Sequence, residues 1–107
     1  MLLLLSSLVL GAAVARAGQA ELTGEVRDQT GAVIVGAAVQ VTDAHTNQVS
    51  RTRTSSGGIY TLTHLEPGLY AVTVEAQGFR RFVREDLALA TGERRRLDVT
   101  LVLDTLS

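Results

Sequence analysis

The side chains that could perform chemistry in this chain are few and widely spaced. Its two histidines, His45 and His64, have no second ligand at a spacing that would hold zinc, and a catalytic zinc needs about three protein ligands plus an open position. Cysteine is absent, which excludes disulfides and thiolate metal sites. We therefore expect both histidines to be exposed turn residues.

The serines and aspartates also lack the companions that catalysis requires. Ser50, Ser55 and Ser56 lie in Thr/Gly-rich turns without a general base or a G-x-S-x-G elbow. Asp28 and Asp43 flank the first hairpin-like unit, and a carboxylate pair could bind Ca²⁺, which takes about six to eight oxygens. Two acids without further donors more often cap turns. We expect turn caps, with no catalytic, cofactor-binding or metal-ligating residue.

Arginine supplies every basic side chain, and the arginines gather in the last third of the chain. Such a group could bind phosphates or an acidic partner, but Glu85, Asp86 and Glu93 interleave with it, so a solvated surface of mixed charge is the simpler interpretation. With a net charge of −1, the chain has no field to recruit nucleic acid or an anionic membrane. The arginines concerned are Arg80, Arg81, Arg84, Arg94, Arg95 and Arg96.

The first residues predict export. An apolar run, Leu2–Val14, precedes Ala15-Arg16-Ala17, which is typical of a signal peptide over 1–17 followed by a mature chain over 18–107. The run is shorter than the roughly twenty apolar residues of a membrane span. Because no basic residue follows Met1, an uncleaved N-terminal anchor remains the alternative.

The elements that must position these side chains are strands, because apolar and polar residues alternate from Glu21 onward and no window holds a helical period. The clearest examples are "ELTGEVR" (21–27), "AAVQVTDA" (37–44) and "LYAVTVEA" (69–76). Seven or so short strands, with a turn every eight to twelve residues, predict an all-β antiparallel sandwich.

Three segments depart from plain alternation. Arg51 and Arg53 alternate along 49–55 and predict a solvated or edge strand. Phe79 and Phe82 fall on opposite faces of 78–85, which predicts a bend or a bulge. In the last strand, one face is expected to carry Arg95, Leu97, Val99, Leu101 and Leu103.

The two tyrosines each follow a glycine-bearing turn. Glu66-Pro67-Gly68 is a turn signal, and Tyr70 comes directly after it. A tyrosine there packs its ring on the core while its hydroxyl reaches the backbone across the corner. We expect this structural role for Tyr70 in preference to stacking on a ligand.

Two stretches carry a family resemblance: "GEVRDQTGAVIVGAAVQVTD" (24–43) and "SSGGIYTLTHLEPGLYAVTVEAQGF" (55–79). They resemble the carboxypeptidase regulatory-like domain, with Val35 in place of its usual proline and Ser55-Ser56 in place of Thr-Asp. The resemblance implies an antiparallel, seven-stranded Greek-key β-sandwich of the transthyretin (prealbumin) type over 18–107, without peptidase activity. Its structural motif falls on Gly24, Asp28, Gly31, Gly36, Tyr60, Leu65, Pro67, Gly68, Tyr70, Gly78 and Phe79.

The leader, this domain and "FVREDLALATGERRRLDVTLVL" (82–103) together resemble the N-terminal extension of Oar-like, TonB-dependent outer-membrane receptors. The resemblance implies a non-enzymatic module in the periplasm or at the outer membrane, or secreted, whose partner is another protein or the rest of a receptor. We expect no cofactor, no nucleic acid and no membrane span in the mature chain; the oligomeric state is open. The alternative is a carbohydrate-binding or adhesion module, which would need exposed aromatic rings.

Overall fold

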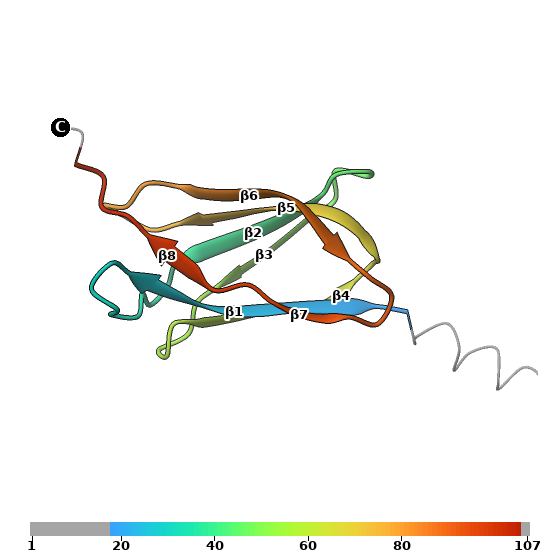
Figure 1. Cartoon of the computed structure of the whole chain (residues 1–107), viewed down its shortest axis with the longest axis horizontal. Helices are drawn as coiled ribbons and strands as arrows, with labels where there is room; N and C mark the ends of the chain where they lie inside the picture. The colour runs from blue at the N-terminus through green and yellow to red at the C-terminus, as the bar shows by residue number, and fades with distance from the viewer. Residues whose placement is uncertain (1–17, 106–107) are drawn as a thin grey trace, which may run out of the picture.

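The computed structural model describes residues 18–105, which fold into two sheets packed face to face as a β-sandwich (Figure 1). One sheet has the order β4-β1-β7, with β8 also paired to β1, and the other has the order β3-β2-β5-β6. The predicted all-β sandwich is confirmed, whereas the predicted leader, 1–17, lies outside the described residues. The strands are β1 (Ala20–Asp28), β2 (Ala38–Asp43), β3 (Val49–Arg53), β4 (Ile59–Leu65), β5 (Gly68–Glu75), β6 (Phe82–Leu89), β7 (Arg94–Arg96) and β8 (Val99–Leu101).

The alternation of apolar and polar residues in the sequence matches the alternation of buried and more exposed residues along the strands. In β1 the inward residues include Leu22 and Val26, and in β5 they are Tyr70, Val72 and Val74, as predicted. All strands except β3 and β7 contribute apolar side chains to the space between the sheets. The free energy gained by burying those side chains is the main stabilisation of the sandwich. Between residues 18 and 105, no helix is long and apolar enough to cross a membrane.

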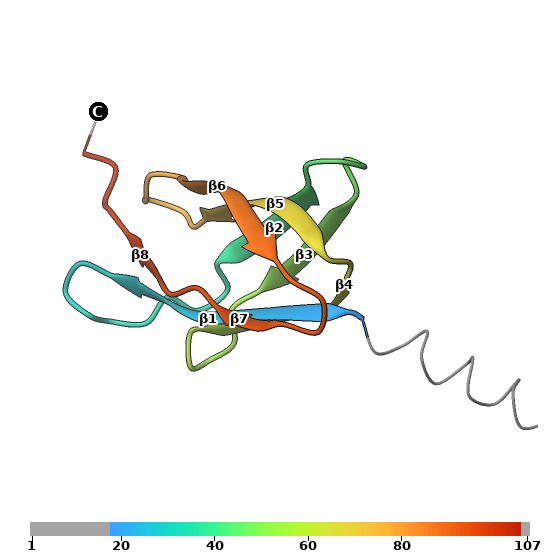
Figure 2. The ribbon, with the colours of Figure 1, turned by 45° about the vertical axis from the view of Figure 1, so that its right-hand side comes forward.

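The C-terminal part of the sandwich differs from the prediction. The single last strand is split at Leu97 and Asp98 into β7 and β8, so the described residues form eight strands, not seven. Both pieces run parallel to β1, so the sheet is not purely antiparallel. A parallel pair needs a crossover between its strands, and here the chain between β1 and β7 forms β4 and the whole β3-β2-β5-β6 sheet (Figure 2). Leu103, expected on the same face as Val99 and Leu101, is 56% exposed, unlike those two buried residues, because it lies beyond the end of β8.

Two bulges interrupt edge strands. The register between β5 and β6 shifts between Tyr70 and Val72, where Glu85 and Asp86 lie opposite a single residue, and Asp86 has a φ of 56°. The bulge therefore lies at the end of the predicted segment 78–85 and not between Phe79 and Phe82, which both pack against the core. The second bulge lies in β4 and includes His64, with a φ of 61°; His64 is exposed, but it lies in a strand and not in the predicted turn.

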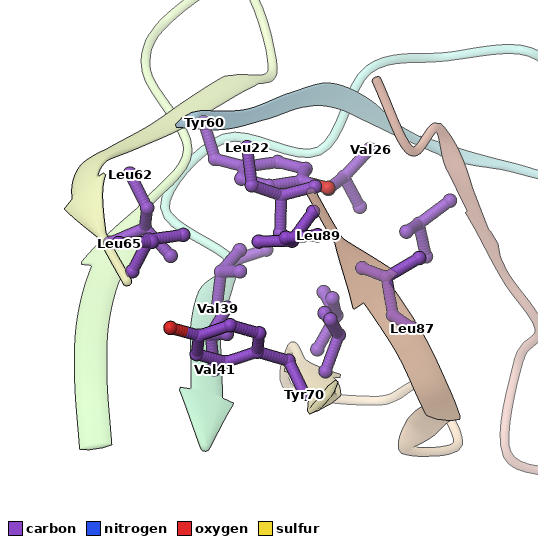
Figure 3. Close-up of a cluster of buried hydrophobic side chains, with 14 of the residues drawn as sticks. Leu22, Val26, Val39, Val41, Tyr60, Leu62, Leu65, Tyr70, Leu87 and Leu89 are labelled. Atoms are coloured by element: carbon purple, nitrogen blue, oxygen red, sulfur yellow. The ribbon is translucent and has the colours of Figure 1, made fainter. Parts of the chain in front are cut away.

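The core lies between the sheets and is built from aliphatic side chains around two tyrosine rings (Figure 3). Tyr60 is the largest fully buried side chain, and its ring lies beside Leu22. Tyr70 is 4% exposed and packs from the opposite sheet, next to Val39 and Val41. With few aromatic residues in the chain, both tyrosines are used to fill the core.

Candidate functional site

One cluster of contacts joins β1 and β4 to the break between β7 and β8. The Tyr60 hydroxyl donates a hydrogen bond of 2.6 Å to the Leu97 carbonyl, and the Leu97 N–H donates one of 2.8 Å to the Thr23 carbonyl. A Cβ atom on Gly24 would lie 1.9 Å from the Leu97 oxygen. Gly24 is therefore required for the close approach of the two backbones. Burial raises the pKa of the Tyr60 hydroxyl to about 12, with a smaller contribution from the charge of Asp98.

Asp98 makes further contacts between β1 and the break that separates β7 from β8. Its Oδ1 accepts hydrogen bonds from the Glu25 N–H at 2.9 Å and from Arg96 Nε at 3.0 Å. The bond from Arg96, followed by the one from the Glu25 backbone, lowers the pKa of the Asp98 carboxyl. Leu97 and Asp98 are not marked in the sequence, because the alternation of apolar and polar residues continues through both of them.

The β4–β5 corner is formed by four of the predicted motif residues. Leu65, 4% exposed, ends β4, Pro67 forms the bend and Gly68 begins β5. The Tyr70 hydroxyl donates a hydrogen bond of 2.5 Å to the Glu66 carbonyl, which confirms the predicted bond from the tyrosine to the corner backbone. Burial is the main cause of the raised pKa of the Tyr70 hydroxyl.

The turn after β1 is held by Asp28. Its Oδ1 accepts hydrogen bonds from the Thr30 N–H at 2.9 Å, the Thr30 hydroxyl at 2.6 Å and the Ala32 N–H at 3.1 Å. The bond from the Thr30 hydroxyl is the largest cause of the lowered pKa of the Asp28 carboxyl. Gly31 and Gly36, with φ of 89° and 74°, provide the left-handed backbone that the segment between β1 and β2 requires.

Asp43 caps a different turn, because its Oδ1 accepts the N–H groups of His45 at 2.8 Å and Thr46 at 3.2 Å. Both aspartates are therefore turn caps, as predicted, and His45 is an exposed turn residue. Within residues 18–105, no three histidine, aspartate or glutamate side chains group together as metal ligands.

The last two motif residues meet the C-terminal segment. Gly78 accepts a hydrogen bond of 3.0 Å from the Asp104 N–H, and Phe79 bridges to Leu103 while packing, half-buried, against the core. The motif residues are thus distributed over separate corners and are not brought together into one site.

Thr54 is a structural residue that sequence analysis missed. It is 5% exposed, its hydroxyl donates to the Ile34 carbonyl at 2.6 Å, and it accepts from the Ala37 N–H at 2.8 Å. These bonds tie the loop before β2 to the end of β3. A threonine in a Thr/Ser-rich stretch gives no local sign of such burial.

The C-terminal arginines separate into two groups on different sheets. Arg94 and Arg95 pair with Glu21 at 3.2 Å and Glu93 at 3.0 Å. Arg80, Arg81 and Arg84 instead lie at the turn into β6 and along it. The pairs leave the surface mixed in charge, which agrees with the simpler of the two interpretations of this cluster.

A hollow lies on the outer face of the β3-β2-β5-β6 sheet, and we call it the β3 hollow. It has a volume of about 560 Å³ and combines three arginines with a single carboxylate. Arg51 Nε donates to Gln40 Oε1 at 3.1 Å, and Arg53 donates to the Gly36 carbonyl at 2.9 Å, so both guanidinium groups are positioned. The hollow is lined by Ala38, Val39, Gln40, Arg51, Thr52, Arg53, Thr73, Glu75 and Arg81.

Solved structures confirm the fold. The Bacillus anthracis TIE protein has a TM-score of 0.68 at 24% identity, covering 80% of this chain and 17% of its own. For a candidate carbohydrate-binding protein from Bacteroides uniformis the TM-score is 0.64 at 21% identity, with coverage of 78% and 41%. Hydroxyquinol 1,2-dioxygenase from Pseudomonas putida DLL-E4 gives 0.65 at 13% identity, with coverage of 82% and 57%.

This chain spans less than two thirds of each of those structures, and at these identities the likeness concerns the fold alone. No curated protein matches the chain in sequence. The family model of the carboxypeptidase regulatory-like domain matches residues 21–102, from the second residue of β1 to just past the end of β8. That match covers most of the chain, which therefore belongs to the carboxypeptidase regulatory-like domain family.

Proposed function

We propose that this chain is a non-enzymatic, exported module with a structural or protein-interaction role. One observation carries the proposal: the polar groups suited to chemistry are bonded within turns and corners, while a broad sheet surface remains open. The hydroxyls of Tyr60 and Tyr70 donate to backbone carbonyls, of Leu97 and Glu66 respectively. The carboxylates of Asp28 and Asp43 accept backbone N–H groups of the turns that they cap. These four groups are held in hydrogen bonds that serve the fold, and none of them is arranged as an activated nucleophile or base.

The proposed setting is the N-terminal periplasmic extension of a TonB-dependent outer-membrane receptor, or a separate copy of that extension. The support is the order of segments in the sequence: an apolar leader over 1–17, the sandwich, and the 82–103 stretch that resembles such receptors. A module of this kind would present its outer sheet surface to another periplasmic protein.

Fractionation of the native host tests this setting. Periplasm, outer membrane and culture medium are separated, and intact masses are measured for species recognised by an antibody against the sandwich. A species starting near Gly18, or a larger outer-membrane polypeptide that contains the sandwich, is expected. Recovery of the protein solely from the cytoplasm, with its first residues intact, would contradict the proposal.

A carbohydrate-binding or adhesion module is the second candidate, favoured by the B. uniformis neighbour and by the hydrogen-bond donors of the β3 hollow. Sugar stacking, however, needs an exposed ring. Tyr60 and Tyr70 are 1% and 4% exposed, and Phe79 and Phe82 pack against the core. Titration with neutral oligosaccharides, followed by amide chemical shifts around Gln40 and Thr73, separates the candidates, because saturable binding would favour the carbohydrate module.

A further inference from the structure

We propose that the free edge of β3 docks an extended, acidic segment of a partner protein, which adds as a fifth strand to the β3-β2-β5-β6 sheet. The proposal rests on the protein-interaction role proposed above and identifies the surface that would perform it. It is supported by the unpaired backbone groups of β3, by the charges of Arg51 and Arg53, and by the bulges or short lengths of the other edge strands.

The backbone of β3 offers unpaired groups along its outer side. The strand is last in its sheet, and it pairs only with β2 (Figures 1 and 2). Gln48 and Thr54 direct their bonds toward the β2 side, to Asp43 and Ala37. Because bonding direction alternates along an antiparallel strand, the N–H and C=O groups of Val49, Arg51 and Arg53 point to the open edge.

The other edges of the described sandwich are less suitable. The bulge at Glu85 and Asp86 interrupts β6, and the one at His64 interrupts β4. β7 and β8 are short pieces separated by Leu97 and Asp98. In contrast, β3 keeps an unbroken register with β2 along its length. Bulges and very short strands are devices that prevent edge pairing. β3 has no bulge, and with five residues it is longer than β7 and β8.

The positive charge of the β3 edge favours an acidic partner strand. Arg51 and Arg53 lie on the same face of β3 and are exposed, and each uses one N–H-bearing nitrogen to hold its position against Gln40 or Gly36. The remaining donors of the two guanidinium groups can bind carboxylates. An antiparallel strand with acidic residues at alternate positions would place one carboxylate opposite each arginine, at about 5 Å between Cβ atoms.

A second copy of this chain is a poor occupant of the same edge. If two β3 strands paired antiparallel about Arg51, that residue would lie opposite its own copy, and like charges directly opposite are destabilising. The arginines therefore oppose self-pairing and favour an acidic strand. The β3 hollow also contains Arg81, but Arg81 pairs with Glu75 at 3.8 Å, so the net positive charge on this side comes from Arg51 and Arg53.

The test uses a synthetic peptide of about eight residues in which glutamate alternates with threonine or valine, a length typical of a strand. It is titrated into the purified protein, and binding is followed by amide chemical shifts and hydrogen exchange. The Val49, Arg51 and Arg53 amides should shift and gain protection. The same peptide with glutamine in place of glutamate should bind about tenfold more weakly, as expected for two exposed ion pairs.

Two double variants of the protein distinguish binding at the β3 edge from attraction by the net charge of the protein. Arg51→Gln/Arg53→Gln should weaken binding of the glutamate peptide about tenfold. Arg84→Gln/Arg94→Gln removes the same charge from β6 and β7 and should leave the affinity within about twofold. Equal weakening by the two double variants would overturn the proposal, because only the net charge of the protein would then matter.

Backbone methylation of the peptide tests the added strand itself. In antiparallel pairing the glutamates opposite the arginines direct their N–H groups toward β3. A peptide methylated on the glutamate nitrogens should lose binding, whereas methylation of the intervening nitrogens should not. Equal binding of the two methylated peptides would overturn strand addition.

These outcomes are independent of export. If fractionation found the protein only in the cytoplasm, the receptor setting would fail while the peptide result stood. If the peptide did not bind, the β3 site would fail while the receptor setting stood.

Discussion

Gly24→Ala should be among the most damaging single-methyl additions to this sandwich. The new Cβ would lie 1.9 Å from the Leu97 carbonyl oxygen, 2.7 Å from its carbon and 2.9 Å from the Tyr60 ring. The first two atoms belong to backbone that is fixed by the Leu97 bond to Thr23. The break between β7 and β8 must therefore move away from β1, because no side-chain rotation can relieve the contact.

The magnitude follows from two contributions to the free energy of unfolding. Overpacking a well-filled interior costs about 1–3 kcal/mol, and displacement of Leu97 adds about 1 kcal/mol for the lost Tyr60 hydrogen bond. The total, about 3 kcal/mol, is a large share of the roughly 5–13 kcal/mol expected for a domain of this size. The midpoint of thermal unfolding should fall by about 12–24 °C.

Calorimetry or urea unfolding measures this loss, and two variants serve as controls. At Gly57 an added Cβ would meet nothing closer than 3.9 Å, so Gly57→Ala should leave stability unchanged or slightly raised. Tyr60→Phe removes the hydrogen bond without the steric contact and should cost about 1 kcal/mol. A Gly24→Ala protein within about 1 kcal/mol of the wild type would refute the close approach of Leu97 to β1.

Further predictions concern the core strands and the tyrosines. Val72 is fully buried, so Val72→Asp should abolish the thermal unfolding transition, because an unpaired buried carboxylate costs several kcal/mol. Thr73→Asp, one residue along on the outer face, should shift the midpoint little. Equal loss of stability in the two variants would contradict the assigned strand register. Tyr70→Phe should lower the free energy of unfolding in urea by about 1 kcal/mol, and no loss would mean that the 2.5 Å bond to the corner backbone adds nothing. The pKa of Tyr60 is raised from 10.0 to about 12, so its neutral form is favoured in the fold; this stabilisation is complete below pH 10 and is lost as the pH rises toward 12. An alkaline unfolding curve should therefore steepen between these values in the wild type and flatten in Tyr60→Phe, and identical curves would contradict the assignment.

The sequence could predict those parts of the fold that depend on local pattern. Alternation places Leu22 and Val26, or Val72 and Val74, on a buried face whatever the neighbouring strands are, and the structure confirms this. The Tyr70 corner was also predictable, because the turn and the tyrosine that bonds to it are adjacent in the chain.

The break between β7 and β8 and their parallel pairing with β1 could not be predicted in this way. Alternation runs through Leu97 and Val99 without interruption, so the local sequence favours one continuous strand. The break follows from a contact between residues far apart in the chain, where Leu97 crosses Gly24. A glycine in a strand can mark the close approach of another backbone, but it does not identify the segment that approaches.

The candidate docking edge at β3 likewise depends partly on the local sequence and partly on features that arise only on folding. Arg51 and Arg53 predicted an edge strand, because two like charges on one face of a strand favour solvent, and β3 is indeed last in its sheet. Their proposed role as a recognition surface depends on a further fact that arises only on folding: the bulges fall on β4 and β6, and β3 has none. A charged edge strand with bulges would be adequately explained as protection against aggregation. An unbroken one retains a complete row of backbone donors and acceptors, so its charges determine which strand can pair with it.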